Sequence, residues 1–183
     1  MGNADRLSWH GHLTMPRYRF EFEMPANTTV AFDAFHFTVW RNQWDSLVGN
    51  TIVQDGAPCP FLDARTNNRG SGLLSLLSME TTFINFDRPK AAAATMNGKS
   101  FPFSRWAASM QHKALPDGHS VLIYTYSFEV WPQGLSWLFQ PFVASLFNYQ
   151  TRRRFKKMQS FLKTHASQIE NWQKLQLQPQ ATE

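Results

Sequence analysis

The stretch VLIYTYSFEVW, residues 121–131, decides the fold of this chain. Every second side chain from Leu122 to Val130 falls on one face of an extended strand, and this face carries Tyr124, Tyr126 and Phe128. A strand with one aromatic face must bury that face against another element. We therefore predict that the aromatic face looks into the protein.

The residues after this strand carry a long helical pattern. Pro132-Gln133-Gly134 interrupts the chain, and apolar side chains then recur at helical spacing. Pro141 is expected to kink or restart the helix near its first turns, because proline lacks an amide donor and clashes with the preceding turn. The stripe predicted to be buried consists of Phe147, Thr151, Phe155, Met158, Leu162, His165, Ile169 and Trp172.

The beginning of the chain predicts one strand and two short helices. In RYRFEFEM, residues 17–24, every second residue is apolar, which is typical of a half-buried strand. A proline ends this strand, and Asn27 or Thr28 is placed to cap the helix that follows. A second short helix is predicted from about Val39 to Val48, closing at Gly49-Asn50.

Between residues 51 and 131 the sequence predicts hairpins, because strand-like segments alternate with groups that favour turns. The expected turns are Asp55-Gly56, Asn67-Asn68-Arg69-Gly70, Asp87-Arg88-Pro89, Asn97-Gly98 and Pro116-Asp117-Gly118. The order of elements is thus one strand, two helices, several strands and a long helix. It predicts an α+β domain in which a curved antiparallel sheet wraps around the C-terminal helix.

A single domain accounts for the chain. Its 183 residues are enough to bury a core without disulfides, and the lone Cys59 has no intramolecular partner. We place the domain at residues 16–172, between a disordered N-terminal segment (1–15) and a polar C-terminal tail (173–183). No apolar run approaches the ~20 residues of a membrane span, and neither a secretory signal nor a myristoylation site is present, which predicts a cytoplasmic protein.

Four segments carry a family likeness through their order and spacing. They are Pro25 to Ala34 (PANTTVAFDA), Trp40 with Trp44-Asp45, Pro102 to Trp106 (PFSRW), and Asp117 to Tyr126 (DGHSVLIYTY). Together they resemble the START-like (SRPBCC) superfamily, in particular its polyketide cyclase/dehydrase and lipid transport branch. The resemblance implies a helix-grip fold with a sheet of about seven strands, two short helices after the first strand, and a closed internal cavity for a lipid, sterol, polyketide or similar molecule.

The leading hypothesis is a protein that binds a hydrophobic small molecule or lipid in an internal cavity, for transport, sensing or storage. The chain is 15% aromatic and has seven methionines, and ligand cavities are mainly apolar with a few oriented polar groups. The same residues would also suit a filled core. The candidate lining residues are Phe35, Trp44, Met79, Met96, Trp106, Met110, Tyr124, Tyr126, Phe128, Phe142 and Leu146.

Two alternatives remain open. A polyketide cyclase- or dehydrase-like enzyme, acting on an aromatic or polyketide substrate, would use Tyr124 and Tyr126 as its candidate catalytic residues, because inward hydroxyls can polarise a carbonyl in a dry cavity. The same hydroxyls would also be suitable as cavity lining. The other alternative is an interaction module whose cavity is vestigial.

Other chemistries lack their motifs. No metal-like spacing occurs apart from His10-x-His12, and no nucleotide-binding fingerprint appears, so neither a metal nor another cofactor is predicted. The net charge of +5 is concentrated in residues 152–157, which we interpret as a solvated helix face. The alternative is a peripheral contact with an anionic membrane through Arg152, Arg153 and Lys156. No basic strand interleaved with aromatic residues accompanies this charge, so nucleic-acid binding is not expected.

Overall fold

The structure is a computed structural model that describes residues 15–71 and 78–177. Its elements are β1 (Arg17–Met24), α1 (Thr28–His36), α2 (Thr38–Trp44), β2 (Val48–Val53), η1 (Gln54–Gly56), β3 (Arg65–Gly70), β4 (Ser78–Asp87), β5 (Ala91–Met96), β6 (Phe103–Ala114), β7 (Ser120–Val130), η3 (Gln133–Leu135) and α3 (Ser136–Leu177). The seven strands form one antiparallel sheet in the order β1-β7-β6-β5-β4-β3-β2. The predicted α+β helix-grip class is confirmed. The N-terminal segment that we predicted to be disordered lies, apart from residue 15, outside the described residues.

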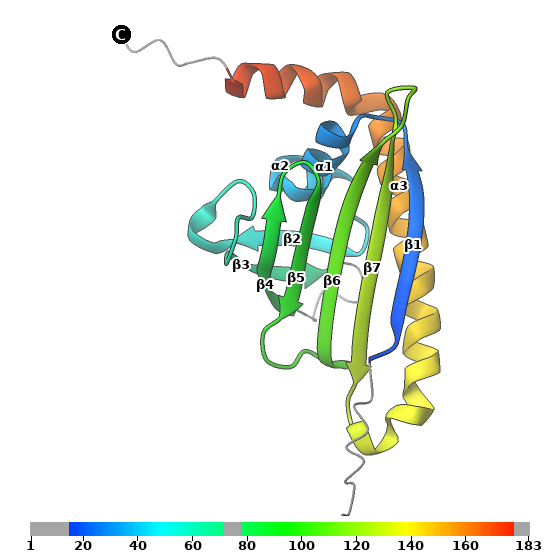
Figure 1. Ribbon diagram of the computed structural model, residues 1–183. Helices are drawn as coiled ribbons and strands as arrows, with labels where there is room; N and C mark the ends of the chain where they lie inside the picture. The colour runs from blue at the N-terminus through cyan, green and yellow to red at the C-terminus, as the bar shows by residue number, and fades with distance from the viewer. Residues whose placement is uncertain (1–14, 72–77, 178–183) are drawn as a thin grey trace, which may run out of the picture.

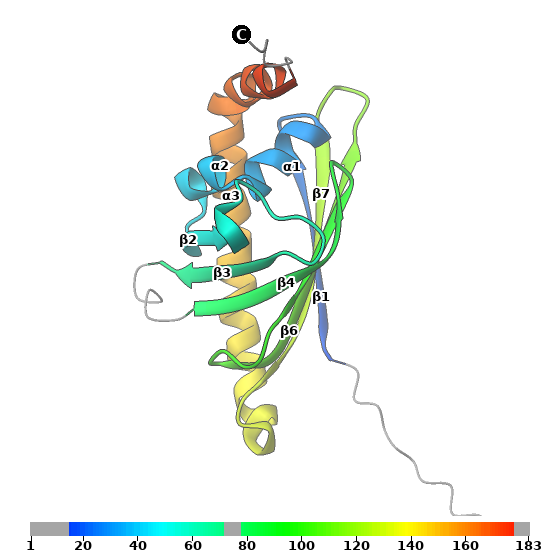
Figure 2. The same cartoon turned by 90° about the vertical axis from the view of Figure 1, so that its left-hand side faces the viewer.

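The sheet curves strongly around α3. In Figure 1 β6 and β7 run along α3, whereas β2 and β3 run across it, and Figure 2 shows the same change of direction from the side. The helices α1 and α2 cover the end of the sheet where β1 finishes. One face of the sheet therefore wraps the long helix, as an antiparallel sheet with one apolar face requires.

The two strands with the clearest alternation lie next to each other at one side of the sheet. Tyr18 pairs with Tyr126 and Phe20 with Tyr124 in the register of β1 and β7. The Tyr18 and Tyr126 rings stack with their centroids 5.4 Å apart. Every residue of the predicted inward face of β7, from Leu122 to Val130, is buried, so this prediction is confirmed.

The first short helix begins as predicted, but the second ends early. The Asn27 side chain accepts a hydrogen bond from the amide of Val30 at 3.0 Å and caps α1. We predicted that the second helix extends to Val48, which was wrong, because α2 ends at Trp44. The Asp45 carboxylate accepts hydrogen bonds from the amides of Leu47 and Val48, at 3.1 and 3.2 Å, and these bonds direct the chain into β2.

One predicted turn is a strand. Residues 67–70 belong to β3, because cross-strand hydrogen bonds hold their polar side chains in the sheet. Asn68 accepts from the hydroxyl of Thr51 at 3.0 Å and donates to Thr66 and Thr81 at 3.1 and 3.3 Å. The other expected turns lie between strands, and Gly56, Gly98 and Gly118 take the positive φ that these turns need.

The long helix α3 runs through Pro141 and does not restart there. In its last part, orange to red in Figure 1, it changes direction over α1 and α2. It ends at Leu177, five residues beyond Trp172, where we had placed the end of the domain. No helix within the described residues is long and apolar enough to cross a membrane.

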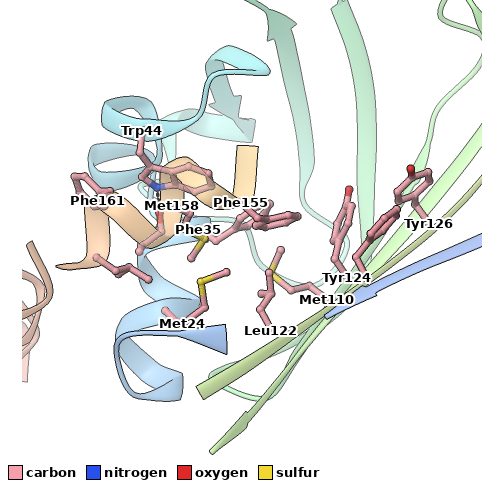
Figure 3. Packing of buried hydrophobic residues seen from close by; sticks show 14 of the residues in the cluster. Met24, Phe35, Trp44, Met110, Leu122, Tyr124, Tyr126, Phe155, Met158 and Phe161 are labelled. Atoms are coloured by element: carbon pink, nitrogen blue, oxygen red, sulfur yellow. Dashed lines mark hydrogen bonds between the residues drawn. The ribbon is translucent and has the colours of Figure 1, made fainter. Parts of the chain in front are cut away.

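Part of the main hydrophobic cluster lies between α3, α1, α2 and the sheet. Figure 3 shows Phe35 and Trp44 from the short helices close to Phe155 and Met158 from α3. Met24 and Leu122 from the sheet side complete this cluster, and all six side chains are buried. The core is thus filled at this end of α3, which leaves the other end for a pocket.

Candidate functional site

A pocket of about 540 Å³ lies between α3 and the curved sheet. This volume falls in the range of pockets that hold small-molecule ligands. The walls are mainly apolar, and they come from α1, α2, the strands β2 to β7 and the first half of α3. Prominent lining residues are Phe35, Met79, Phe83, Ala92, Ala94, Phe103, Trp106, Ala108, Met110, Tyr124, Val130, Val143 and Phe147.

Among the residues that the structure describes, the pocket is open to solvent at one end. Phe101, Trp131, Phe139, Phe142 and Leu146 line it there, and each is more than two-fifths exposed. They come from the turn between β5 and β6, the end of β7 and the first turns of α3. The resemblance implied a closed cavity, but the pocket formed by the described residues is open. The rim at this open end is apolar and exposed.

The inner end of the pocket is charged. Arg41 of α2 and Arg154 of α3 both line it, and both are buried, with 7% and 4% of their surface exposed. Asp45 lies beside them, and its side chain is fully buried. Its Oδ2 accepts hydrogen bonds from Nε of Arg41 at 3.0 Å and from Nη2 of Arg154 at 2.5 Å. The C-terminal end of α2 and the middle of α3, which are 109 residues apart, thus meet in one buried ionic cluster, Arg41, Asp45 and Arg154.

The charge states in this cluster follow from its geometry. Burial alone would raise the pKa of Asp45, but the charges and hydrogen bonds of Arg154 and Arg41 outweigh it and hold the pKa below its usual value. Burial lowers the pKa of Arg41, and Asp45 opposes that shift. A guanidinium stays protonated in proteins. The cluster therefore carries two positive charges and one negative charge.

Two further polar side chains line the pocket near this cluster. Burial raises the pKa of Tyr124, and the nearby Arg154 and Arg41 oppose the shift, so its hydroxyl stays neutral. Burial lowers the pKa of His36 well below its usual value, so its ring is neutral as well. Nδ1 of His36 lies 2.9 Å from the carbonyl of Phe32 and donates to it. Neither residue offsets the excess positive charge.

The predicted lining residues fall into two groups. Phe35, Met79, Trp106, Met110, Tyr124, Phe142 and Leu146 are brought together around the pocket. Trp44, Met96, Tyr126 and Phe128 are buried in the packed core and do not belong to the lining.

Of the two candidate catalytic tyrosines, one lines the pocket and the other lies in the packed core. Figure 3 shows them side by side on β7, but only Tyr124 lines the pocket. The hydroxyl of Tyr126 donates to Oδ1 of Asn148 on α3. Its ring packs edge-on against Phe147, with centroids 4.9 Å apart. The first half of α3 therefore covers Tyr126.

Sequence reasoning missed the charged end of the pocket. We assigned the charges of residues 152–157 to a solvated helix face, which was wrong for Arg154, because it is buried. The exposed residues Arg152, Arg153, Lys156 and Lys157 fit that interpretation. The signal was present in the spacing, because Arg154 follows Thr151 by three residues and precedes Met158 by four. It thus lies along the predicted apolar stripe.

A group of possible metal ligands lies elsewhere, at an exposed turn. Nδ1 of His119 lies 3.3 Å from Glu23 and 3.3 Å from Asp117, and the three side chains are close enough to share an ion. Glu23 and Asp117 are solvent-exposed, and exposed acidic groups are common without a metal. The lone Cys59 is half-buried, and burial raises the pKa of its thiol, so it is a poor nucleophile.

Comparison with known proteins shows that solved structures share this fold. No protein-family description matches the sequence, and no curated protein matches it either. Solved structures match well: a protein from Thermus thermophilus has a TM-score of 0.66 at 11% identity, over 80% of this chain and 97% of its own. A conserved protein from Geobacillus kaustophilus has a TM-score of 0.64 at 13% identity, over 82% and 97%.

A third match is Ara h 8.0201, with a TM-score of 0.61 at 10% identity, over 82% of this chain and 99% of its own. Identities this low establish a shared fold and nothing finer. Membership of the superfamily, and of the branch suggested by the sequence, is therefore still a prediction. The chain has a Bet v1/START-like fold.

Proposed function

We propose that this protein binds a hydrophobic small molecule or lipid in the pocket between α3 and the sheet, for transport, sensing or storage. The observation that carries the proposal is the pocket itself, about 540 Å³ in volume and lined mainly by apolar side chains. Ligand sites are concave and lined mainly by apolar side chains, and this pocket has both properties. This favours ligand binding over an interaction module with a vestigial cavity.

The direct test is to ask what the purified protein carries. Native mass spectrometry and solvent extraction are expected to recover an apolar molecule, and the neutral dye N-phenyl-1-naphthylamine is expected to bind and fluoresce. Ala108 lines the pocket, whereas its neighbour Ala107 does not. Ala108→Trp should therefore abolish dye binding, with Ala107→Trp as the matched control. Dye binding that survives Ala108→Trp in a folded protein counts against the proposal.

For the enzymatic alternative, one of the two candidate catalytic tyrosines is left. Only Tyr124, of the two candidate tyrosines, lines the pocket, and its neutral hydroxyl lies near two guanidinium groups. An enzyme acting on a polyketide would then have to use Tyr124 together with Arg154 or Arg41. The apolar walls favour binding without reaction.

We propose also that the open end of the pocket docks on an anionic membrane, from which an apolar ligand would enter. Trp131, Phe142 and the neighbouring Trp137 are exposed there, and tryptophan is enriched where proteins meet the membrane interface. Arg152 and Arg153 are exposed further along α3, and each cation near an anionic surface contributes about 1 kcal/mol.

Vesicle sedimentation tests this docking. Binding is expected to phosphatidylcholine vesicles that contain phosphatidylserine, to weaken with salt, and to be lost in Trp137→Ser or when Arg152, Arg153 and Lys156 all become Gln. The control also replaces three cations by Gln, but at Lys90, Lys113 and Lys174, which are exposed and lie outside residues 152–156. The proposal is contradicted if the protein does not sediment with the vesicles. It is also contradicted if the protein forms a dimer that covers the open end.

A further inference from the structure

The charged end of the pocket indicates which class of apolar molecule fits it. Arg41 and Arg154 are the only charged side chains in the lining that the described residues form. Asp45 is the single counter-ion, and it is fully engaged: Oδ1 accepts from two backbone amides and Oδ2 from the two guanidinium groups. The pocket therefore ends in one uncompensated positive charge.

A buried charge without a partner is costly, so it calls for an anion. Nε of Arg154 is buried and has no hydrogen-bond partner among the described residues. Both guanidinium groups lie over the ring of Phe35, 4.8 and 4.7 Å from its centroid. This contact holds them in place and offsets part of the cost, but it supplies no acceptor for Nε of Arg154.

We infer that the ligand is an amphipathic acid, whose carboxylate binds Arg41 and Arg154 and whose apolar body extends to the open end. The inference rests on the proposed function. Planar guanidinium groups match a carboxylate by paired charge-assisted hydrogen bonds. From Arg154 to Phe142, at the open end, α3 spans twelve residues, which is about 18 Å. That length suits a long-chain acid better than a small one.

Displacement of N-phenyl-1-naphthylamine by oleate and by oleyl alcohol separates the charge from the apolar body. At pH 8 oleate is expected to bind at least tenfold more tightly than the alcohol. Equal affinities would overturn the carboxylate assignment and leave ligand binding intact, and displacement by neither would also count against the acid. A protein that binds neither the dye nor either lipid would contradict the proposed function itself.

Substitutions locate the effect. Arg154→Met leaves a neutral pair of Arg41 and Asp45, and it should weaken oleate binding at least tenfold while changing oleyl alcohol binding less than threefold. The control is Arg153→Met, because Arg153 is the exposed neighbour on the same helix. Oleate binding that does not change in a folded Arg154→Met protein would refute the assignment.

A measurement on the unmodified protein does not depend on how the variants fold. The ¹³C resonance of carboxyl-labelled oleate reports its ionisation directly. In the complex, the pKa of the carboxyl is expected to fall below that of the same acid free in water, because two guanidinium groups favour the charged form. A bound carboxyl that titrates at or above the pKa of the free acid would show that it does not contact the arginines.

Discussion

Arg154 of α3 donates from Nη2 to Oδ2 of Asp45 at 2.5 Å, across 109 residues of sequence. The same oxygen accepts from Arg41, so a single carboxylate joins α2, α3 and the start of β2. The cluster that closes the pocket is thus also a tie between the short helices and the long one. Stability and the proposed ligand binding therefore depend on overlapping residues.

Asp45→Asn is expected to destabilise the protein by about 3 to 5 kcal/mol, because it leaves two buried guanidinium groups without a counter-ion. Urea unfolding followed by circular dichroism measures the change. Glu21→Gln is the control, since Glu21 pairs with Arg19 at 2.6 Å where both side chains are 56% exposed. An exposed pair of this kind contributes at most about 1 kcal/mol. Equal losses in the two variants would show that the buried cluster has no special role.

Because of His112, the free energy of unfolding is expected to decrease in acid. Burial lowers its pKa from 6.5 to about 4. Between these values the unfolded chain binds a proton that the folded ring does not, so stability falls as the pH drops from 6.5 to 4. The loss for this residue is about 3 kcal/mol. The neutral ring of His36 contributes in the same direction.

His112→Phe checks this assignment. Both ring nitrogens of His112 are buried without a partner among the described residues, and the ring packs against Phe32 with centroids 5.5 Å apart. The variant is therefore expected to be at least as stable at pH 7 and to lose less stability at pH 4. Urea midpoints at several pH values measure both effects. A pH dependence that matches the parent protein would contradict the assignment.

The last turns of α3 are tied to the domain by Gln173. Its side-chain amide donates to Asp33 at 2.6 Å, and Asp33 is fully buried and also bound by Arg88. Gln173→Ala is expected to destabilise the protein by about 1 to 3 kcal/mol, because a bond to a charged group is lost. Gln176→Ala, in the exposed last turn, should have almost no effect. Equal thermal melting curves for both variants would show that this contact is unimportant.

The fold could be predicted from sequence because alternation and turn residues report directly on strands. The order of one strand, two short helices, several strands and a long helix followed from these patterns, whereas the number of about seven strands was implied by the family resemblance. Asn67 and Asn68 misled the prediction, because asparagine favours turns locally, but here Asn68 forms cross-strand hydrogen bonds with Thr51 and Thr81. Tertiary contacts of this kind have no local signal.

The site was predictable only in part. Alternation places Tyr124, Tyr126 and Phe128 on one face, but it does not say which part of that face α3 covers. In the structure Phe147 packs against Tyr126 and Phe128, so the pocket includes Tyr124 and excludes the other two. Whether an apolar face is covered or hollow depends on the path of the facing helix, which periodicity does not contain.

Trp106 offers an optical test of ligand binding. It lines the pocket, and its indole Nε1 is buried without a partner among the described residues. A ligand that enters the pocket changes the surroundings of this ring, so the intrinsic fluorescence of the protein should change on oleate binding. Because Trp131 also lines the pocket, the comparison is made in a Trp131→Phe background, where Trp106→Phe should remove most of that change and, because no hydrogen bond is lost, leave the melting temperature nearly unaltered. An equal signal in the variant would place the ligand elsewhere.

Removal of the hydroxyl should affect stability at one tyrosine of β7 and ligand affinity at the other. Tyr126→Phe removes the bond to Asn148 and should lower stability by about 1 kcal/mol, with ligand affinity unchanged. Tyr124→Phe should change ligand affinity, because its hydroxyl lies in the pocket beside Arg154. If the protein turns over a polyketide, only Tyr124→Phe should abolish turnover. Loss of turnover in Tyr126→Phe, with affinity and stability retained, would instead mean that Tyr126 reaches the substrate and that the first half of α3 moves away from the sheet when the substrate binds.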